Sequence, residues 1–147
     1  MRAWRGAAVL GALGLLALSG PALADHGKVG LWESSVSVTA PGADRPQVVT
    51  NRHCMTVAEV AGPALKAPPE SGCTMQNTRT EGGTFSGDLV CTGQQKSSGH
   101  MTITYDGPEH YTGRMTLNTT AQDGSPVVID QTMEGRWIAA SCGNVTQ

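Results

Sequence analysis

The sequence contains few aromatic residues, which make up 4% of its 147 positions. After the first 24 positions only five remain: Trp32, Phe85, Tyr105, Tyr111 and Trp137. Aromatic side chains bury the largest apolar areas per residue, so their scarcity predicts a thin hydrophobic core. Small cores commonly depend on covalent cross-links for their stability.

An excess of basic residues is also missing. The chain holds 10 Lys and Arg residues against 12 Asp and Glu residues, for a formal net charge of −2. Nucleic acids and anionic membranes attract proteins chiefly through clustered lysines and arginines. We therefore expect neither of them as a partner.

The sequence lacks the common motifs of catalytic and redox sites. It has no GxSxG, HExxH, Walker A or CxxC pattern, and no cysteines and histidines at zinc-finger spacing. We therefore expect a protein that is not an enzyme and that holds no cofactor. An enzyme whose site lies in the loops is one alternative.

Long apolar runs are missing except near the N-terminus. There an apolar run over residues 7–18 follows two arginines and precedes small residues at 21–24, which is the pattern of a cleavable signal peptide. The run is too short for a membrane anchor. We predict a signal peptide over residues 1–24, no membrane span after cleavage, and a periplasmic or secreted protein.

Four cysteines lie in the remaining chain, at Cys54, Cys73, Cys91 and Cys142. An even number in an exported protein predicts two disulfides, for which three pairings exist. The segment between Cys73 and Cys91 has the pattern of a hairpin turning at residues 81–83. Counting outward from this turn places Cys73 opposite Cys91, which favours the pairs Cys73–Cys91 and Cys54–Cys142.

Apolar and polar residues alternate with period 2 along most of the chain after residue 24, which predicts β-strands. Residues 25–147 are therefore expected to form a single all-β domain. A capping box from Thr56 to Glu59 predicts one short helix after the second strand. The expected strands cover residues 31–39, 47–54, the two arms of the 73–91 hairpin, 99–105, 111–119 and 127–138.

About seven antiparallel strands in sequential order predict a meander that curls into a barrel or half-barrel, with a sandwich as the alternative. Pairing Val38 with Val48 sets Trp32 opposite Cys54, beside a disulfide. In the hairpin, Met75 is expected opposite Leu89. Two longer cross-strand rows are predicted, one of Met75, Leu89, Met101, Met115 and Met133, and one of Phe85, Tyr105, Tyr111 and Trp137.

One face of the expected sheet is apolar. Its side chains either fill the core or present a surface to a small hydrophobic ligand or an envelope protein, so a binding module is the first functional hypothesis. A partner that docks along exposed strand edges is a further possibility. The candidate ligand-binding residues are Met101, Ile103, Tyr105, Tyr111, Met115, Ile129 and Trp137.

Copper binding is another alternative. A mature chain that begins with Asp25-His26 offers a free amine and an imidazole, and methionine thioethers bind Cu(I). Most of the methionines, however, fall at inward strand positions, where methionine commonly fills the core. The expected register turns His53 and His100 toward solvent. The sequence therefore assigns no residue to a metal site.

Several short motifs together resemble a known family. Gly30-Leu31-Trp32-Glu33 and Cys54-Met55-Thr56 come first, a hairpin with a cysteine at each end follows, and Gly135-Arg136 and Cys142-Gly143 close the pattern. In these motifs the sequence resembles the exported bacterial family of domain of unknown function 3617. Residues 137–141 lengthen the interval before the last cysteine. The resemblance implies a small exported domain and assigns no catalytic residue.

Overall fold

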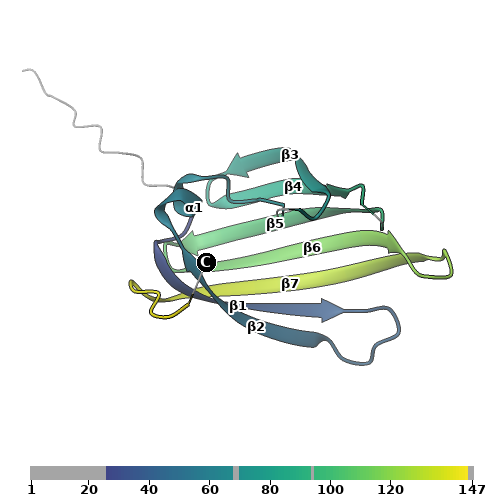
Figure 1. The fold of residues 1–147 in the computed structure, drawn as a ribbon, viewed down its shortest axis with the longest axis horizontal. Helices are drawn as coiled ribbons and strands as arrows, with labels where there is room; N and C mark the ends of the chain where they lie inside the picture. Colours follow the sequence, from purple (N-terminus) through teal and green to yellow (C-terminus); the bar gives the residue numbers. More distant parts are fainter. Residues whose placement is uncertain (1–25, 68–69, 94, 146–147) are drawn as a thin grey trace, which may run out of the picture.

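The computed structural model of the chain describes residues 26–67, 70–93 and 95–145, so the predicted signal peptide lies outside the described residues. These residues form one antiparallel sheet and one short helix (Figure 1). The all-β fold with a helix after the second strand is confirmed. The elements are β1 (Gly30–Thr39), β2 (Gln47–Met55), α1 (Val57–Ala61), β3 (Cys73–Glu81), β4 (Thr84–Cys91), β5 (Ser97–Gly107), β6 (His110–Thr120) and β7 (Pro126–Ala139).

The strands lie in the order β2-β1-β7-β6-β5-β4-β3. The predicted sequential order is right from β3 to β7, but β1 pairs with β7 and not only with β2. As a result β2 and β3, which follow one another in the chain, lie at opposite edges of the sheet. The sheet is curled but not closed into a barrel (Figure 1).

The connection from β2 to β3 therefore has to pass from one edge of the sheet to the other, and it carries α1 (Figure 1). The predicted capping box starts this helix: Thr56 N donates to Glu59 Oε2 at 2.8 Å, and Glu59 N donates to Thr56 Oγ1 at 3.3 Å. Further along the connection, the side chain of Leu65 is only 6% exposed. The connection is thus packed against the sheet.

The hairpin of β3 and β4 has the predicted register at its open end, where Cys73 faces Cys91 and Met75 faces Leu89. The register then shifts after Gln76, next to Asn77, whose φ is 50°. This left-handed conformation is one that asparagine adopts more readily than most residues. Beyond this irregularity the same count from the turn, which predicts Arg79 opposite Phe85, is wrong, because Phe85 faces Thr80 there.

The other registers depend on the lengths of the turns. Trp32 faces His53 and not Cys54, because β2 begins with Gln47 opposite Val38, one position from the predicted alignment. Between β4 and β5, and between β6 and β7, the turns are tighter by two residues than expected. A shift of two changes cross-strand partners but keeps every side chain on its face. The predicted pairs within β5 and β6 are confirmed, since Met101 faces Met115 and Tyr105 faces Tyr111.

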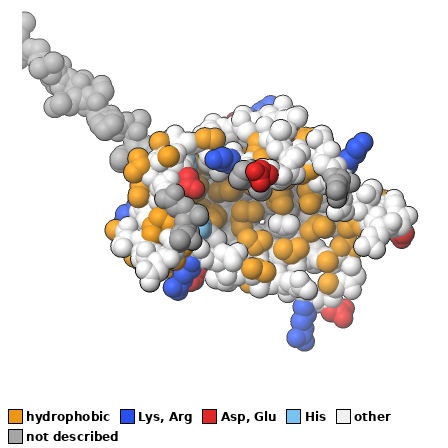
Figure 2. Space-filling model, in the orientation of Figure 1, with side chains coloured by type: hydrophobic (Ala, Val, Ile, Leu, Met, Phe, Trp, Pro, Cys, Tyr) orange, Lys and Arg blue, Asp and Glu red, His pale blue; other side chains and the backbone are white. Residues whose placement is uncertain are grey.

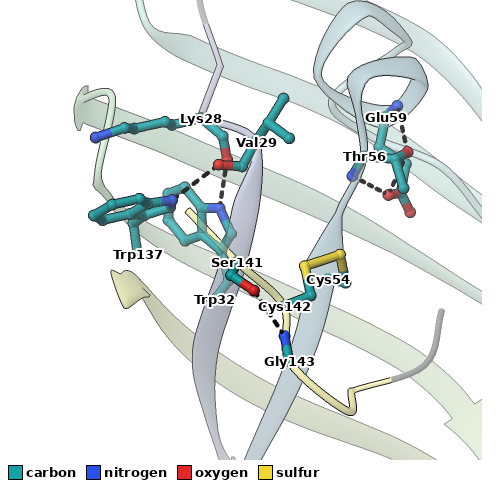
Figure 3. The surroundings of a disulfide bond; sticks show 10 residues. All are labelled: Lys28, Val29, Trp32, Cys54, Thr56, Glu59, Trp137, Ser141, Cys142 and Gly143. Atoms are coloured by element: carbon teal, nitrogen blue, oxygen red, sulfur yellow. Dashed lines mark hydrogen bonds between the residues drawn. A yellow bond between two sulfur atoms is a disulfide. The ribbon is translucent and has the colours of Figure 1, made fainter. Parts of the chain in front are cut away.

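Two disulfides join Cys54 to Cys142 and Cys73 to Cys91, the pairs that the hairpin register favours. The first links β2 to the segment after β7, past the intervening β1 (Figure 3). Their Cα–Cα distances are 5.5 and 3.9 Å.

The hydrophobic core is thin, as the composition predicts. Trp32 is completely buried, at 0% exposed, and its indole Nε1 donates to the carbonyl of Lys28 at 2.7 Å (Figure 3). The other buried hydrophobic side chains among the described residues are Leu65, Phe85, Tyr111 and Met115.

Gly135 provides the space that Tyr111 occupies on the neighbouring strand. A Cβ at Gly135 would lie 2.0 Å from Cε1 of Tyr111, whose hydroxyl forms a 2.7 Å hydrogen bond with Ser34 Oγ. We expect Gly135→Ala to lower the free energy of unfolding by about 1–3 kcal/mol, the usual cost of overpacking. Urea denaturation measures this loss.

Gly93→Ala is the matched control for this substitution, because a Cβ there would come no closer than 3.7 Å to Ser71 O. It should leave the urea midpoint nearly unchanged. Equal stability of the two variants would show that Tyr111 can move aside at no cost.

Candidate functional site

The sheet has one apolar face, and the register defines it. Val36 faces Met133, which faces Gly113, which faces Ile103, so these positions point to the same side. Figure 2 shows hydrophobic side chains gathered in a hollow on the side of the domain that is turned to the viewer. The apolar face comprises Trp32, Val36, Val38, Phe85, Leu89, Met101, Ile103, Tyr105, Tyr111, Met115, Leu117, Ile129 and Met133.

One end of the apolar face is an aromatic cluster, which we call the covered end. The ring of Tyr105 lies 5.2 Å from that of Tyr111, 6.0 Å from that of Phe85 and 6.3 Å from that of Trp32. His26 packs on top, with its ring 5.2 Å from that of Phe85, and is only 9% exposed. The segment before β1 and the β2–β3 connection thus close this end of the face.

The other part of the apolar face, which we call the open end, has no such cover among the described residues. All of its larger side chains are half-buried, although they point to the same side as the buried core. The sheet is a single layer, and the aromatic cluster is packed only at the covered end. The open end is formed by Met101, Ile103, Leu117, Ile129 and Met133.

Glycines on the apolar face make room for long neighbouring side chains. A Cβ at Gly113 would lie 2.6 Å from Met133 Cγ, and a Cβ at Gly87 would lie 2.9 Å from Met75 Cε. Methionine side chains are flexible and polarizable, so this surface can adapt to different apolar shapes.

The sequence-predicted ligand residues are divided between the two ends. Tyr111 and Met115 are each only 9% exposed and belong to the core. Trp137 lies opposite Trp32, and its indole Nε1 donates to the carbonyl of Val29 at 3.0 Å (Figure 3). Lys28 lies over the Trp137 ring, with Nζ 3.7 Å from its centroid. Trp137 therefore fixes the segment before β1.

Met101, Ile103 and Ile129 do lie at the open end. Leu117 and Met133 also belong to this surface, although they are not among the predicted ligand residues. Both follow the same period-2 alternation as Met101, Ile103 and Ile129, so the sequence pattern indicates them too. What the pattern lacked was the information that this part of the face has no cover.

A pocket of about 260 Å³ lies at the covered end, between α1 and the sheet. Its lining includes His53, Met55, Ala58, Pro63 and Tyr105. Burial lowers the pKa of His53, and the nearby Glu59 partly offsets this effect. Burial, with a smaller contribution from Tyr111, raises the pKa of Tyr105 to about 12. The prediction that His53 faces solvent is wrong, because it is half-buried on the same face as Trp32.

The sequence of this domain matches a known family. A family model described as "Protein of unknown function (DUF3617)" matches residues 27–142. The chain belongs to this family. The match extends from the segment before β1 to the last cysteine. No match was found among curated proteins or among solved structures.

The polar face of this DUF3617 domain carries its exposed charges. Hydrogen bonds to Asp106 at 2.8 Å and to Glu134 at 3.2 Å raise the pKa of His110. His100 is exposed, as predicted, and pairs with Asp88 at 2.7 Å. That hydrogen bond, with a second one from Asn77, lowers the pKa of Asp88. Exposed pairs of this kind add little to stability, so this face is an ordinary solvated surface.

A large hollow lies on the same polar side of the DUF3617 domain. It is an open groove of about 510 Å³, lined mostly by serine and threonine hydroxyls with Arg114 and Glu134. The described residues contain no group of three or more His, Cys, Asp or Glu side chains placed to hold a metal ion. No helix in the described ranges is long and apolar enough to cross a membrane.

The copper alternative depends on the start of the chain. Asp25 lies outside the described residues. His26 is buried against Phe85 and Tyr105, and its Nε2 lies 3.4 Å from the carbonyl oxygen of Glu59. An imidazole packed in this way has a structural role in closing the covered end.

Proposed function

We propose that this protein is a non-catalytic binding module whose apolar face receives a hydrophobic ligand. The observation that carries the proposal is the open end, where large apolar side chains share a face with the core but are only partly buried. Contiguous exposed apolar surface on a protein usually marks a binding site. A ligand bound there would complete the second layer that the sheet lacks.

The chemistry of the open end supports a small apolar ligand. Met101 and Met133 lie there beside Ile103 and Ile129, and the described strand positions on this face of β5, β6 and β7 carry no charged side chain. Burial of apolar area contributes roughly 25 cal/mol per Å². Flexible methionines allow ligands of different shape to gain that energy.

The proposed location is the periplasm or the extracellular medium. Two disulfides fit an oxidising compartment. The N-terminal sequence pattern of a cleavable signal supports the same compartment. The ligand would accordingly be an apolar molecule of the cell envelope or its surroundings.

Binding of the neutral fluorescent probe N-phenyl-1-naphthylamine tests the proposal. Wild-type protein should enhance the fluorescence of the probe, and Ile129→Asp should weaken its binding by about tenfold or more, which corresponds to roughly 1.4 kcal/mol. The reason is that the new carboxylate would have to lose water when the probe covers it.

Val128→Asp is the matched control, since Val128 is 49% exposed and points to the other face of the same strand. This variant should bind the probe as the wild type does. Equal binding by both variants, or no binding by the wild type, would contradict a ligand site on the apolar face. Native mass spectrometry of the purified protein gives an independent reading, as a co-purifying small molecule should be present.

A further inference from the structure

The pocket at the covered end is lined partly by side chains of the apolar face, among them His53 and Tyr105. Tyr105 lines the pocket and also belongs to the aromatic cluster that borders the open end. Ala58 from α1 and Pro63 from the β2–β3 connection form the opposite wall. Tyr105 is thus the residue that the pocket and the aromatic cluster have in common.

Three hydrogen-bond donors line the pocket and have no partner in the described part of the chain. They are the imidazole of His53, the ammonium group of Lys66 and the hydroxyl of Tyr105, none of which forms a hydrogen bond or ion pair with a described residue. Tyr105 keeps its proton at neutral pH, because burial raises its pKa to about 12. Donors in a largely apolar pocket are typical of a site that fixes a polar group of a ligand.

One carboxylate oxygen of Glu59, the acidic residue of the pocket, is engaged in the capping box. Glu59 Oε2 accepts hydrogen bonds from Thr56 N at 2.8 Å and from Thr56 Oγ1 at 2.9 Å in the capping box. These bonds lower the pKa of the Glu59 carboxyl group, which therefore stays ionised. Its negative charge has the sign opposite to that of the nearby Lys66. The ammonium of Lys66 can only donate, whereas His53 and Tyr105 can each donate or accept, so an acceptor group of a ligand can receive hydrogen bonds from all three.

We propose that this pocket binds the carboxylate of a long-chain acid, whose apolar chain lies on the apolar face. The inference rests on the proposed function and names its ligand class. A carboxylate is an acceptor-only group that can receive hydrogen bonds from Lys66, Tyr105 and His53 at once. Charge-assisted hydrogen bonds of this kind are about twice as strong as neutral ones.

Isothermal titration with three probes tests this assignment: dodecanoate, 1-dodecanol and acetate, each below its aggregation concentration. Dodecanoate should bind about tenfold more tightly than 1-dodecanol, and acetate alone should not bind measurably. Tyr105→Phe and Lys66→Gln should each weaken dodecanoate binding by roughly tenfold, as expected for a lost hydrogen bond to a charged group. Neither should change the binding of 1-dodecanol.

Lys96→Gln, remote from this pocket and lining another one, is the control for Lys66→Gln and should leave dodecanoate binding unchanged. Equal affinities for dodecanoate and 1-dodecanol, unaffected by both pocket variants, would overturn the carboxylate site while leaving the proposed function standing. Absence of binding for both twelve-carbon probes would overturn the two together. Near-ultraviolet circular dichroism establishes that each variant is folded.

Discussion

Trp32→Ala is expected to destabilise the protein by about 3–5 kcal/mol, the usual cost of removing a large aromatic side chain from a core. Trp32 is completely buried, and its ring lies 5.7 Å from that of Tyr111 and 6.3 Å from that of Tyr105. It also donates a 2.7 Å hydrogen bond to the carbonyl of Lys28. Few other side chains are available to fill the cavity. Urea denaturation of wild type and variant measures the loss.

Trp137→Ala is the natural comparison, because Trp137 is the same residue type and faces Trp32 across the β1–β7 pair. Its side chain is only half-buried, so it should cost clearly less than Trp32→Ala. A loss for Trp32→Ala no larger than that for Trp137→Ala would mean that the aromatic cluster is not the main core of the domain.

Removal of the Cys54–Cys142 disulfide is the second large change. These residues are separated by 88 positions, whereas Cys73 and Cys91 are separated by 18. In the chain-entropy model the longer closure contributes about 4–5 kcal/mol to stability and the shorter about 3 kcal/mol. The double variant Cys54→Ala/Cys142→Ala should therefore be destabilised more than Cys73→Ala/Cys91→Ala. Urea midpoints of the two double variants measure this difference.

The structure gives a second reason for this order. The Cys54–Cys142 bond ties the edge strand β2 to the segment after β7, whereas Cys73 and Cys91 already face one another in a hydrogen-bonded hairpin. A greater loss on removal of the short closure would contradict the entropic argument. Such a result would mean that the stability of the fold depends mainly on the edge of the sheet at β3.

The thin core and the proposed function have a common cause. A single curled sheet has two faces, and here only the polar one is suited to water. The β2–β3 connection and the segment around His26 cover the apolar face at the aromatic end, and the described residues leave its other part only partly buried. Disulfides compensate for the limited burial, and the open end is the surface to which we assign binding.

Local sequence patterns were sufficient for the secondary structure and for part of the pairing. Alternation identified the strands and their apolar face, and the capping box identified α1. Counting from one turn aligned Cys73 with Cys91. These features depend on neighbouring residues only, so they can be read from a single sequence.

The registers show where that information ends. A turn that is two residues tighter than expected keeps each side chain on its face, so the apolar face of β4 to β7 was predicted correctly while its cross-strand partners were not. In β2 a shift of one residue changed the face, and His53 points inward. At Asn77 a left-handed residue accompanies a register shift within β3 that the alternation did not indicate. Turn length and local irregularities thus limit register prediction more than they limit face prediction.

By itself, the sequence determined an all-β chain with one apolar face, one short helix and a cysteine-closed hairpin. Only the tertiary structure decided that β1 pairs with β7, which places β2 and β3 at opposite edges. No local pattern specifies a pair between the first and last strands, because its partners are about a hundred residues apart. That one pairing sends the β2–β3 connection past the aromatic end, where it forms the pocket beside Tyr105.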